Sequence, residues 1–187
     1  MAILISIRKA VGLIVLLSLF LGTSYARCAE TTMPEYHVKA LFLFNFAKYV
    51  EWPSNALADT ATPICIGVVG ESQVGEGLRK AVEGKSVGGR TVVIRKIEKD
   101  EELAKCHILF ISSSEKKRLA EILTNLKNMP VLTVGEVEQF IEQGGVINFT
   151  KKEGKVRLEI DLDAARQANL QISSKILNVA DVVKGKK

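Results

Sequence analysis

The chain has 187 residues, of which 47% are apolar, 25% charged and 6% aromatic, and its formal net charge is +5. This composition excludes a disordered chain and a multi-pass membrane protein. The length is sufficient for one domain whose hydrophobic core needs neither a metal nor a dense disulfide framework.

Residues 1–26 have the layout of a secretory signal peptide. Two basic residues precede an apolar run over 10–21, and small side chains follow at Ser24 and Ala26. The run is about a dozen residues, shorter than the roughly 20 that a membrane-spanning helix needs, which favours a cleaved signal over a retained anchor. We expect cleavage after Ala26, with Ala29 as the alternative, and one domain over 27–187 in the periplasm.

Removal of this segment lowers the net positive charge of the chain. The segment contains two basic residues and no acidic ones, so 24 Lys+Arg remain against 21 Asp+Glu, a net charge of +3. The remaining basic residues are scattered, and no aromatic side chains alternate with them as a stacking platform for bases requires. The sequence therefore predicts no nucleic-acid partner.

The first predicted element of the mature chain is a helix over 33–50. Thr32 and Glu35 have the spacing of a capping box at its start, and Trp52-Pro53 ends it because the residue before a proline avoids the helical region. Its apolar residues cover most of its circumference, and Leu41 and Asn45 are predicted to lie on the apolar face.

Strands and helices then alternate, which predicts a mostly parallel sheet flanked by helices, a doubly wound, Rossmann-like α/β domain. Further capping boxes run from Ser112 to Glu115 and from Thr133 to Glu136. A hairpin turning near Glu153 and two short helices follow. The predicted strands are 64–69, 91–97, 107–112, 131–134, 146–150 and 156–161, and the predicted helices are 74–82, 115–126, 136–142 and two that begin near 162 and 173.

Cys65 and Cys106 lie near the starts of two predicted strands. In the 2-1-3-4-5 strand order these strands are neighbours and both cysteines lie at the amino-terminal level, so a disulfide is plausible in an oxidising compartment. The bridge would close a loop of about 40 residues, for which the chain-entropy model gives roughly 4 kcal/mol. A structural role is favoured, and redox sensing is the alternative. Cys28 is left without a predicted partner.

No residue pattern predicts catalysis, a cofactor or a metal site. The segment from Gly70 to Gly77 resembles a phosphate loop, but it has Glu76 and Gly77 where that loop needs lysine and a hydroxyl. His37 and His107 lack metal ligands at a suitable spacing. A thiol oxidoreductase is disfavoured because the chain has no Cys-x-x-Cys motif.

A crevice at the carboxyl ends of the parallel strands is the predicted place for a small ligand. The residues expected to line it are Gly70, Glu71, Ser112, Ser113 and Thr133. This crevice supports an alternative function, a periplasmic small-ligand receptor that feeds a sensor kinase or another membrane protein.

Four blocks of sequence resemble the YfiR family of exported bacterial regulatory proteins. They are 45–53, 106–112, 144–149 and 156–175, in the same order as in the family and across nearly all of the mature chain. The resemblance implies a single periplasmic domain, no known catalysis and the Cys65 and Cys106 pair. The namesake has a second cysteine pair towards its carboxyl end, whereas this chain has no cysteine after Cys106.

The namesake represses an inner-membrane diguanylate cyclase by binding its periplasmic sensor region, which lowers cyclic di-GMP and restrains biofilm formation. The resemblance therefore implies a non-catalytic protein that binds and represses a membrane-bound signalling protein, a diguanylate cyclase first and a sensor kinase second. Whether the protein acts as a homodimer is left open.

Overall fold

The computed structural model describes residues 33–57, 59 and 61–185. The predicted signal peptide, its cleavage sites, Cys28 and the Thr32 capping position lie outside these residues. None of the helices in the described part is both long and apolar enough to cross a bilayer.

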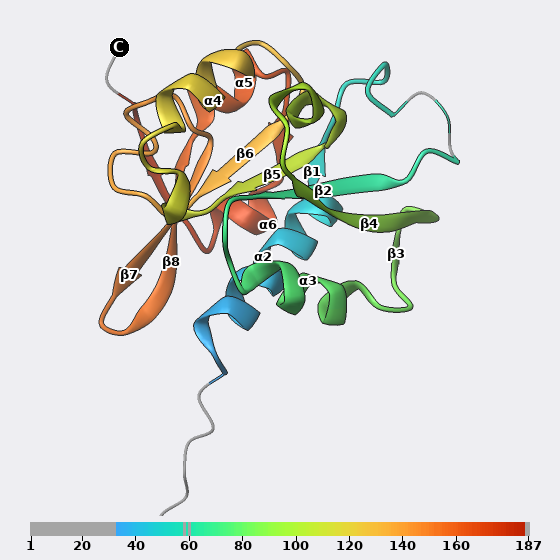
Figure 1. The fold of residues 1–187 in the computed structure, drawn as a ribbon, viewed down its shortest axis with the longest axis horizontal. Helices are drawn as coiled ribbons and strands as arrows, with labels where there is room; N and C mark the ends of the chain where they lie inside the picture. Colours follow the sequence, from blue (N-terminus) through green and yellow to red (C-terminus); the bar gives the residue numbers. More distant parts are fainter. Residues whose placement is uncertain (1–32, 58, 60, 186–187) are drawn as a thin grey trace, which may run out of the picture. The chain divides into compact units, whose positions relative to one another are not determined.

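A central sheet organises the described residues (Figure 1). Its strands follow the order β10-β8-β7-β6-β5-β2-β4-β3. The five strands β4, β2, β5, β6 and β7 are mutually parallel, and they have the predicted 2-1-3-4-5 order. The strands are β2 Ile64–Val69, β3 Ser86–Val87, β4 Arg90–Ile97, β5 Ile108–Ile111, β6 Leu132–Gly135, β7 Ile147–Lys152, β8 Lys155–Asp161 and β10 Asp181–Val183.

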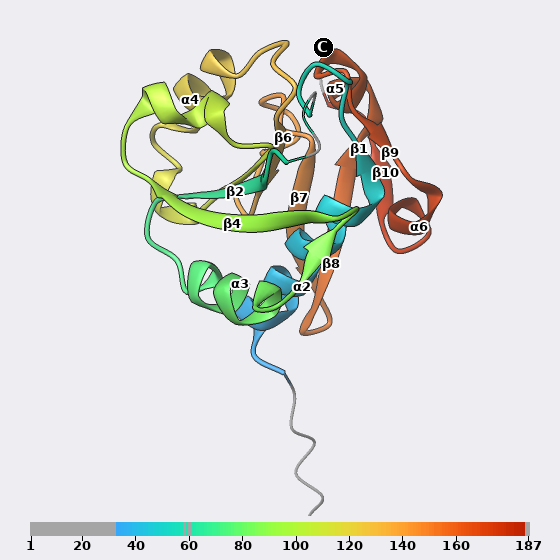
Figure 2. The same ribbon diagram turned by 90° about the vertical axis from the view of Figure 1, so that its right-hand side faces the viewer.

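The prediction of a mostly parallel sheet between helices is confirmed. Helices α2 (Glu35–Tyr49) and α3 (Val74–Val82) cover one face of the sheet, and α4 (Leu119–Asn125) covers the other (Figures 1 and 2). The core has two parts, one on each face. Strand β2 is buried along its whole length because it is central and covered on both sides.

The first helix is shorter than predicted and differs in its exposed face. Leu41 and Asn45 are exposed, so the prediction that both lie on the buried face was wrong. The buried side chains of α2 are Lys39, Ala40, Leu43, Phe44, Phe46 and Ala47.

The predicted helix 136–142 is absent, and a series of turns takes its place. Gln139 has φ 63°, which a right-handed helix does not allow. The ring of Phe140 lies between two glycines: a Cβ on Gly135 would lie 2.2 Å from the ring, and one on Gly145 would lie 2.0 Å away. The absence of a side chain at both glycines therefore lets this buried ring pack directly against backbone.

The predicted helix 115–126 is divided into a 3-10 turn, η2 (Ser113–Glu115), and α4. Ser112 caps η2, since its hydroxyl accepts from the Ser114 amide. The hairpin β7–β8 is antiparallel, as predicted, and the closing helices are α5 (Leu162–Gln167) and α6 (Ser174–Leu177). Asp161 is 6% exposed and caps α5.

The sequence reasoning missed several short elements. Strands β1 (Val50–Glu51) and β9 (Gln171–Ile172) form a separate two-stranded sheet. Strand β10 extends the main sheet by pairing in parallel with β8, and η1 (Asp100–Lys105) is a 3-10 helix that precedes Cys106.

Candidate functional site

Three residues at the carboxyl ends of β2 and β5 are joined by their own hydrogen bonds. The Ser112 hydroxyl donates to the Glu71 carbonyl at 2.7 Å, and the Glu71 amide donates to Ser114 Oγ at 3.0 Å. Gly70 has φ 83°, and a Cβ there would lie 2.3 Å from Ser114 Oγ, so this close approach requires glycine. The polar groups of the predicted crevice are thus largely occupied by contacts that hold two loops together.

A hollow of about 530 Å³ lies beside these loops and is lined by Gly70 and Glu71 but not by Ser112, Ser113 or Thr133. Arg79 and Arg95 also line it, and the Glu71 carboxylate pairs with Lys96 at 2.9 Å.

Thr133 lies elsewhere. Its side chain is buried, its hydroxyl accepts from the Val146 amide at 3.0 Å, and it lines a different hollow of about 670 Å³. The structure therefore does not bring the five predicted crevice residues into one pocket, and ligand binding at that crevice stays a prediction.

A chain of ion pairs links α2 to the loops that follow β5 and β6. Lys39 Nζ lies 2.7 Å from Glu35 Oε1 and 2.7 Å from Glu136 Oε2. Glu136 Oε1 in turn accepts from the Ser113 amide at 3.2 Å. Sequence reasoning assigned Glu136 to a capping box; the structure shows instead that its carboxylate joins three segments that are distant in the sequence.

Lys39 is buried, with 8% of the residue exposed, so its ammonium group needs these carboxylates to remain charged. Burial alone lowers the pKa of Lys39, but the hydrogen bonds to Glu136 and Glu35 outweigh it, and the net pKa is raised. The hydrogen bond from Lys39 likewise holds the pKa of Glu35 below its usual range. Lys39 and Glu35 are therefore both charged at neutral pH.

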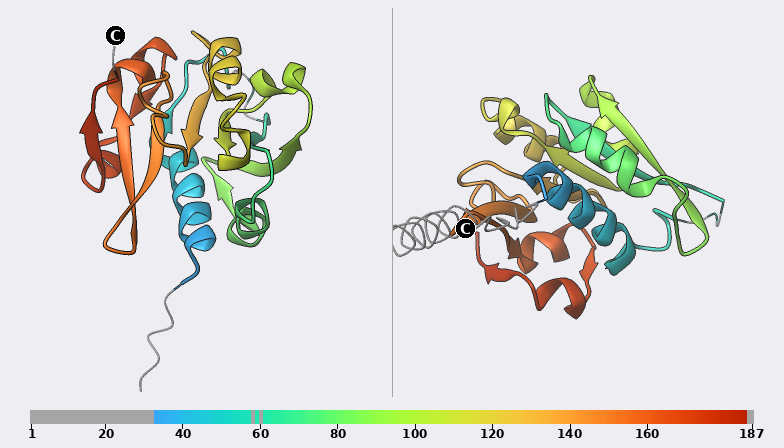
Figure 3. Two further views of the ribbon diagram at one scale, coloured as in Figure 1. Left: turned by 60° about the vertical axis from the view of Figure 1, so that its left-hand side comes forward. Right: turned by 90° about the horizontal axis from the view of Figure 1, so that it is seen from below.

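Beside this network lies a hollow of about 460 Å³, which we call the acidic hollow. It is open to solvent and is bordered by α2, the turns after β6 and the β7–β8 hairpin, and Figure 3 shows α2 running beside that hairpin. Lys39 and Lys151 are its basic lining residues. Its acidic lining residues are Glu35, Glu136, Glu138, Glu142 and Glu159.

Asn148 also lines the acidic hollow and is 4% exposed. Its Oδ1 is the buried side-chain polar atom that has no hydrogen-bond partner among the described residues. Most buried polar groups are paired, so this amide is an exception that requires an explanation.

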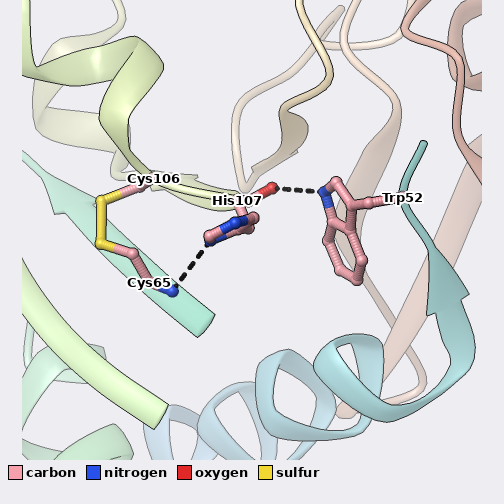
Figure 4. Close-up of a disulfide and its surroundings, with 4 residues drawn as sticks. All are labelled: Trp52, Cys65, Cys106 and His107. Carbon is pink, nitrogen blue, oxygen red and sulfur yellow. Dashed lines mark hydrogen bonds between the residues drawn. A yellow bond between two sulfur atoms is a disulfide. The ribbon is translucent and has the colours of Figure 1, made fainter. Parts of the chain in front are cut away.

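The opposite, amino-terminal end of the sheet carries a disulfide between Cys65 and Cys106, with Cα atoms 4.6 Å apart (Figure 4). Both cysteines are buried, at 4% and 2% exposure. The bridge joins the start of β2 to the residue two before β5, as expected for neighbouring parallel strands.

His107, next to Cys106, has both ring nitrogens engaged with backbone. Nδ1 accepts from the Cys65 amide at 3.0 Å, which leaves the proton on Nε2, 3.3 Å from the Ala56 carbonyl. The indole of Trp52 donates to the His107 carbonyl at 3.2 Å (Figure 4). Burial lowers the pKa of His107. This histidine therefore acts as a neutral hydrogen-bonding residue beside the disulfide.

No group of three or more His, Cys, Asp and Glu side chains is placed to hold a metal ion within the described residues.

Comparisons with solved structures concern the fold alone. The ABC domain in complex with L-Trp from Streptococcus pneumonia is 14% identical, with a TM-score of 0.54, over 77% of this chain and 60% of that one. A conserved domain protein from Vibrio cholerae is 15% identical, with a TM-score of 0.46, over 64% and 54%. The chain thus spans less than two thirds of the length of either structure.

Among curated proteins nothing matches the chain. The model of the YfiR/HmsC-like family matches residues 36–181, which include every helix described above except the first residue of α2. The resemblance noted from the four sequence blocks is confirmed. The chain belongs to the YfiR/HmsC-like family, known as periplasmic regulators of cyclic di-GMP signalling.

Proposed function

We propose that this protein binds the periplasmic part of a membrane-bound diguanylate cyclase and represses it. The observation that carries the proposal is the family match over residues 36–181. The signal peptide expected at residues 1–26 supports it, because export places the protein on the same side of the membrane as such a sensor region.

The geometry supports binding rather than catalysis. The hydroxyl of Ser112 caps a turn, and His107 directs both nitrogens at backbone groups. A general base must reach the proton of a nucleophile or substrate, and these groups are already engaged. Their role is to hold the loops at the two ends of the sheet.

The mechanism is a population shift in the cyclase. A bound regulator lowers cyclase activity only to the extent that it binds the inactive state more tightly than the active one. Moving the cyclase from mostly active to mostly inactive, from 99:1 to 1:99, needs a difference of roughly 10⁴-fold in affinity between the states.

The test is deletion of the gene followed by measurement of cellular cyclic di-GMP and of the membrane proteins that co-purify with the tagged protein. Deletion should raise the cellular level of cyclic di-GMP. Expression of the full chain in the deletion strain should return that level to the wild-type value. A chain that lacks residues 1–26 is the matched control, because it makes the same domain without export and should not restore repression.

Unchanged cyclic di-GMP, together with co-purification of no inner-membrane signalling protein, would overturn the proposal. Co-purification of a sensor kinase with cyclic di-GMP unchanged would favour the second partner class instead.

A further inference from the structure

We propose that the acidic hollow is a binding site for a small organic cation with two or more ammonium groups, such as a diamine or polyamine. The proposal does not depend on which membrane protein is the partner, since it rests on the charges and the buried amide that line the hollow.

The charges of the lining residues favour a cation. Five carboxylates and two ammonium groups give a formal charge of −3 if all are ionised. The two lysines are already paired, Lys39 with Glu35 and Glu136, and Lys151 with Glu35 at 3.2 Å. The carboxylates of Glu138, Glu142 and Glu159 have no ion pair among the described residues. They are therefore available to a ligand that carries positive charge.

Asn148 is the second, independent observation. It comes from strand β7, away from the loop that carries Glu138 and Glu142, and its amide is buried without a partner for Oδ1. The Asn148 side chain lines the hollow, and its unpartnered Oδ1 is a hydrogen-bond acceptor. A ligand N–H group that enters the hollow then supplies the missing donor.

An ammonium group matches both observations because it donates hydrogen bonds and carries the charge that the carboxylates lack. The carboxylates surround the hollow from the loop and the hairpin, and in the described residues they do not converge on one point as metal ligands do. Separated carboxylates suit a cation whose charges are spaced along a chain. The volume of about 460 Å³ is within the range of small-molecule sites.

Occupation of the hollow has a structural consequence. Glu136 binds both Lys39 of α2 and the Ser113 amide after β5. A ligand ammonium beside Glu136 competes with Lys39 for the same carboxylate. The ligand would therefore act on the contact that joins α2 to the sheet.

The experiment is isothermal titration of the purified mature protein with spermidine and with putrescine in about 0.15 M salt, where the Debye length is about 8 Å. We expect one spermidine per chain, with putrescine binding more weakly because it carries fewer charges. The variant Glu138→Gln/Glu142→Gln should weaken spermidine binding by at least about tenfold. The matched control is Glu98→Gln/Glu101→Gln, which makes the same charge change at two exposed residues outside the hollow and should bind as the wild type does.

A second readout follows the buried amide directly. In a ¹H–¹⁵N spectrum, the side-chain NH₂ signals of Asn148, assigned by their loss in Asn148→Leu, should shift on addition of spermidine. Asn148→Leu should bind spermidine more weakly, and thermal unfolding without ligand verifies that both hollow variants fold.

Absence of spermidine binding at millimolar concentration would overturn the proposal. So would binding that both charge variants weaken equally, because this result indicates general attraction to a negative surface. Saturable binding with no change in the Asn148 signals would also overturn it, because the ligand would then lie elsewhere.

Discussion

The two ends of the parallel strands are held together by different chemistry. At the amino-terminal end, a disulfide joins β2 to the start of β5, and a neutral histidine and an indole add hydrogen bonds to backbone. At the carboxyl end, the loops are joined by hydroxyls, a lysine and carboxylates, chiefly through Lys39, Glu136 and Ser113.

The amino-terminal end is therefore held by a covalent bond, whereas the carboxyl end, which we call the adaptable end, is held by contacts that can be exchanged. Covalent and neutral contacts are insensitive to salt, whereas ion pairs depend on ionic strength and on competing charges. Two hollows lined by charged side chains lie at the adaptable end, beside loops that follow β2 and β6. We infer that the disulfide keeps the sheet constant while the loops at the other end respond to ligands or partners.

The largest expected effect comes from removing the disulfide at the amino-terminal end of the sheet. Cys65→Ala/Cys106→Ala should lower the free energy of unfolding by about 4 kcal/mol, because the bridge closes a loop with a sequence separation of 41. Urea unfolding followed by circular dichroism measures the loss. Reductant should destabilise the wild type similarly and leave the double variant unchanged. Free thiols at both positions in exported protein, found by alkylation and mass spectrometry, would contradict the assignment.

The second prediction concerns the packing that shapes the adaptable end. Gly145→Ala should cost about 3 kcal/mol, because the new Cβ would lie 2.0 Å from the Phe140 ring and the turns after β6 would have to move. Gly75→Ala is the control, since Gly75 lies within helix α3 and its Cβ would be an ordinary 3.7 Å from the nearest atom, Cγ2 of Val68, and it should be neutral or stabilising. Equal melting temperatures for the two variants would show that Phe140 does not hold these turns.

The third prediction tests the ion pairs. Lys39→Met should lower the free energy of unfolding by about 2 kcal/mol, because it leaves the largely buried carboxylate of Glu136 without its cation. The double variant Lys39→Met/Glu136→Leu should recover part of that loss. Lys80→Met removes an exposed Lys–Glu pair on α3 and should change stability little. If urea unfolding gives the same result for Lys39→Met and Lys80→Met, the ion pairs of Lys39 contribute no more to stability than an exposed pair does.

The smallest expected effect is at His107. Its pKa is lowered in the folded state, so the unfolded chain binds more protons as the pH falls. Stability is therefore fully present above the ordinary histidine pKa of about 6.5 and is lost as the pH falls from there toward the folded-state value. Urea unfolding between pH 7 and pH 5 measures the change, which His107→Gln should reduce. A flat wild-type profile over this interval would contradict the prediction.

The main sheet could be predicted because its signals are local and its strands are long. Strand 64–69 and helix 74–82 agree with the structure residue for residue, and alternation of strands with helices indicated the parallel order. Strands β1, β9 and β10 have two or three residues, too few for a pattern, and they exist because distant segments pair with them.

The candidate site was harder to predict because its side chains bind partners that are distant in the sequence. Thr133 and Glu136 have capping-box spacing, yet the Thr133 hydroxyl accepts from Val146 and the Glu136 carboxylate binds Lys39, 97 residues away. A local motif does not reveal such partners. A signal that could have been used is the run of acidic residues over 136–142 close to Gly144, which is unusual for a loop at the end of a buried strand.

The pairing of β1 with β9 has a consequence for the time at which folding can finish. Val50 pairs with Ile172, and the Ser173 amide donates to the Tyr49 carbonyl, so the end of the first helix is bound by residues near the end of the chain. During synthesis or export these residues emerge long after α2. The segment from Cys65 to Cys106 can be joined before they emerge, but α2 acquires its final neighbours only after residues 171–173 have been released.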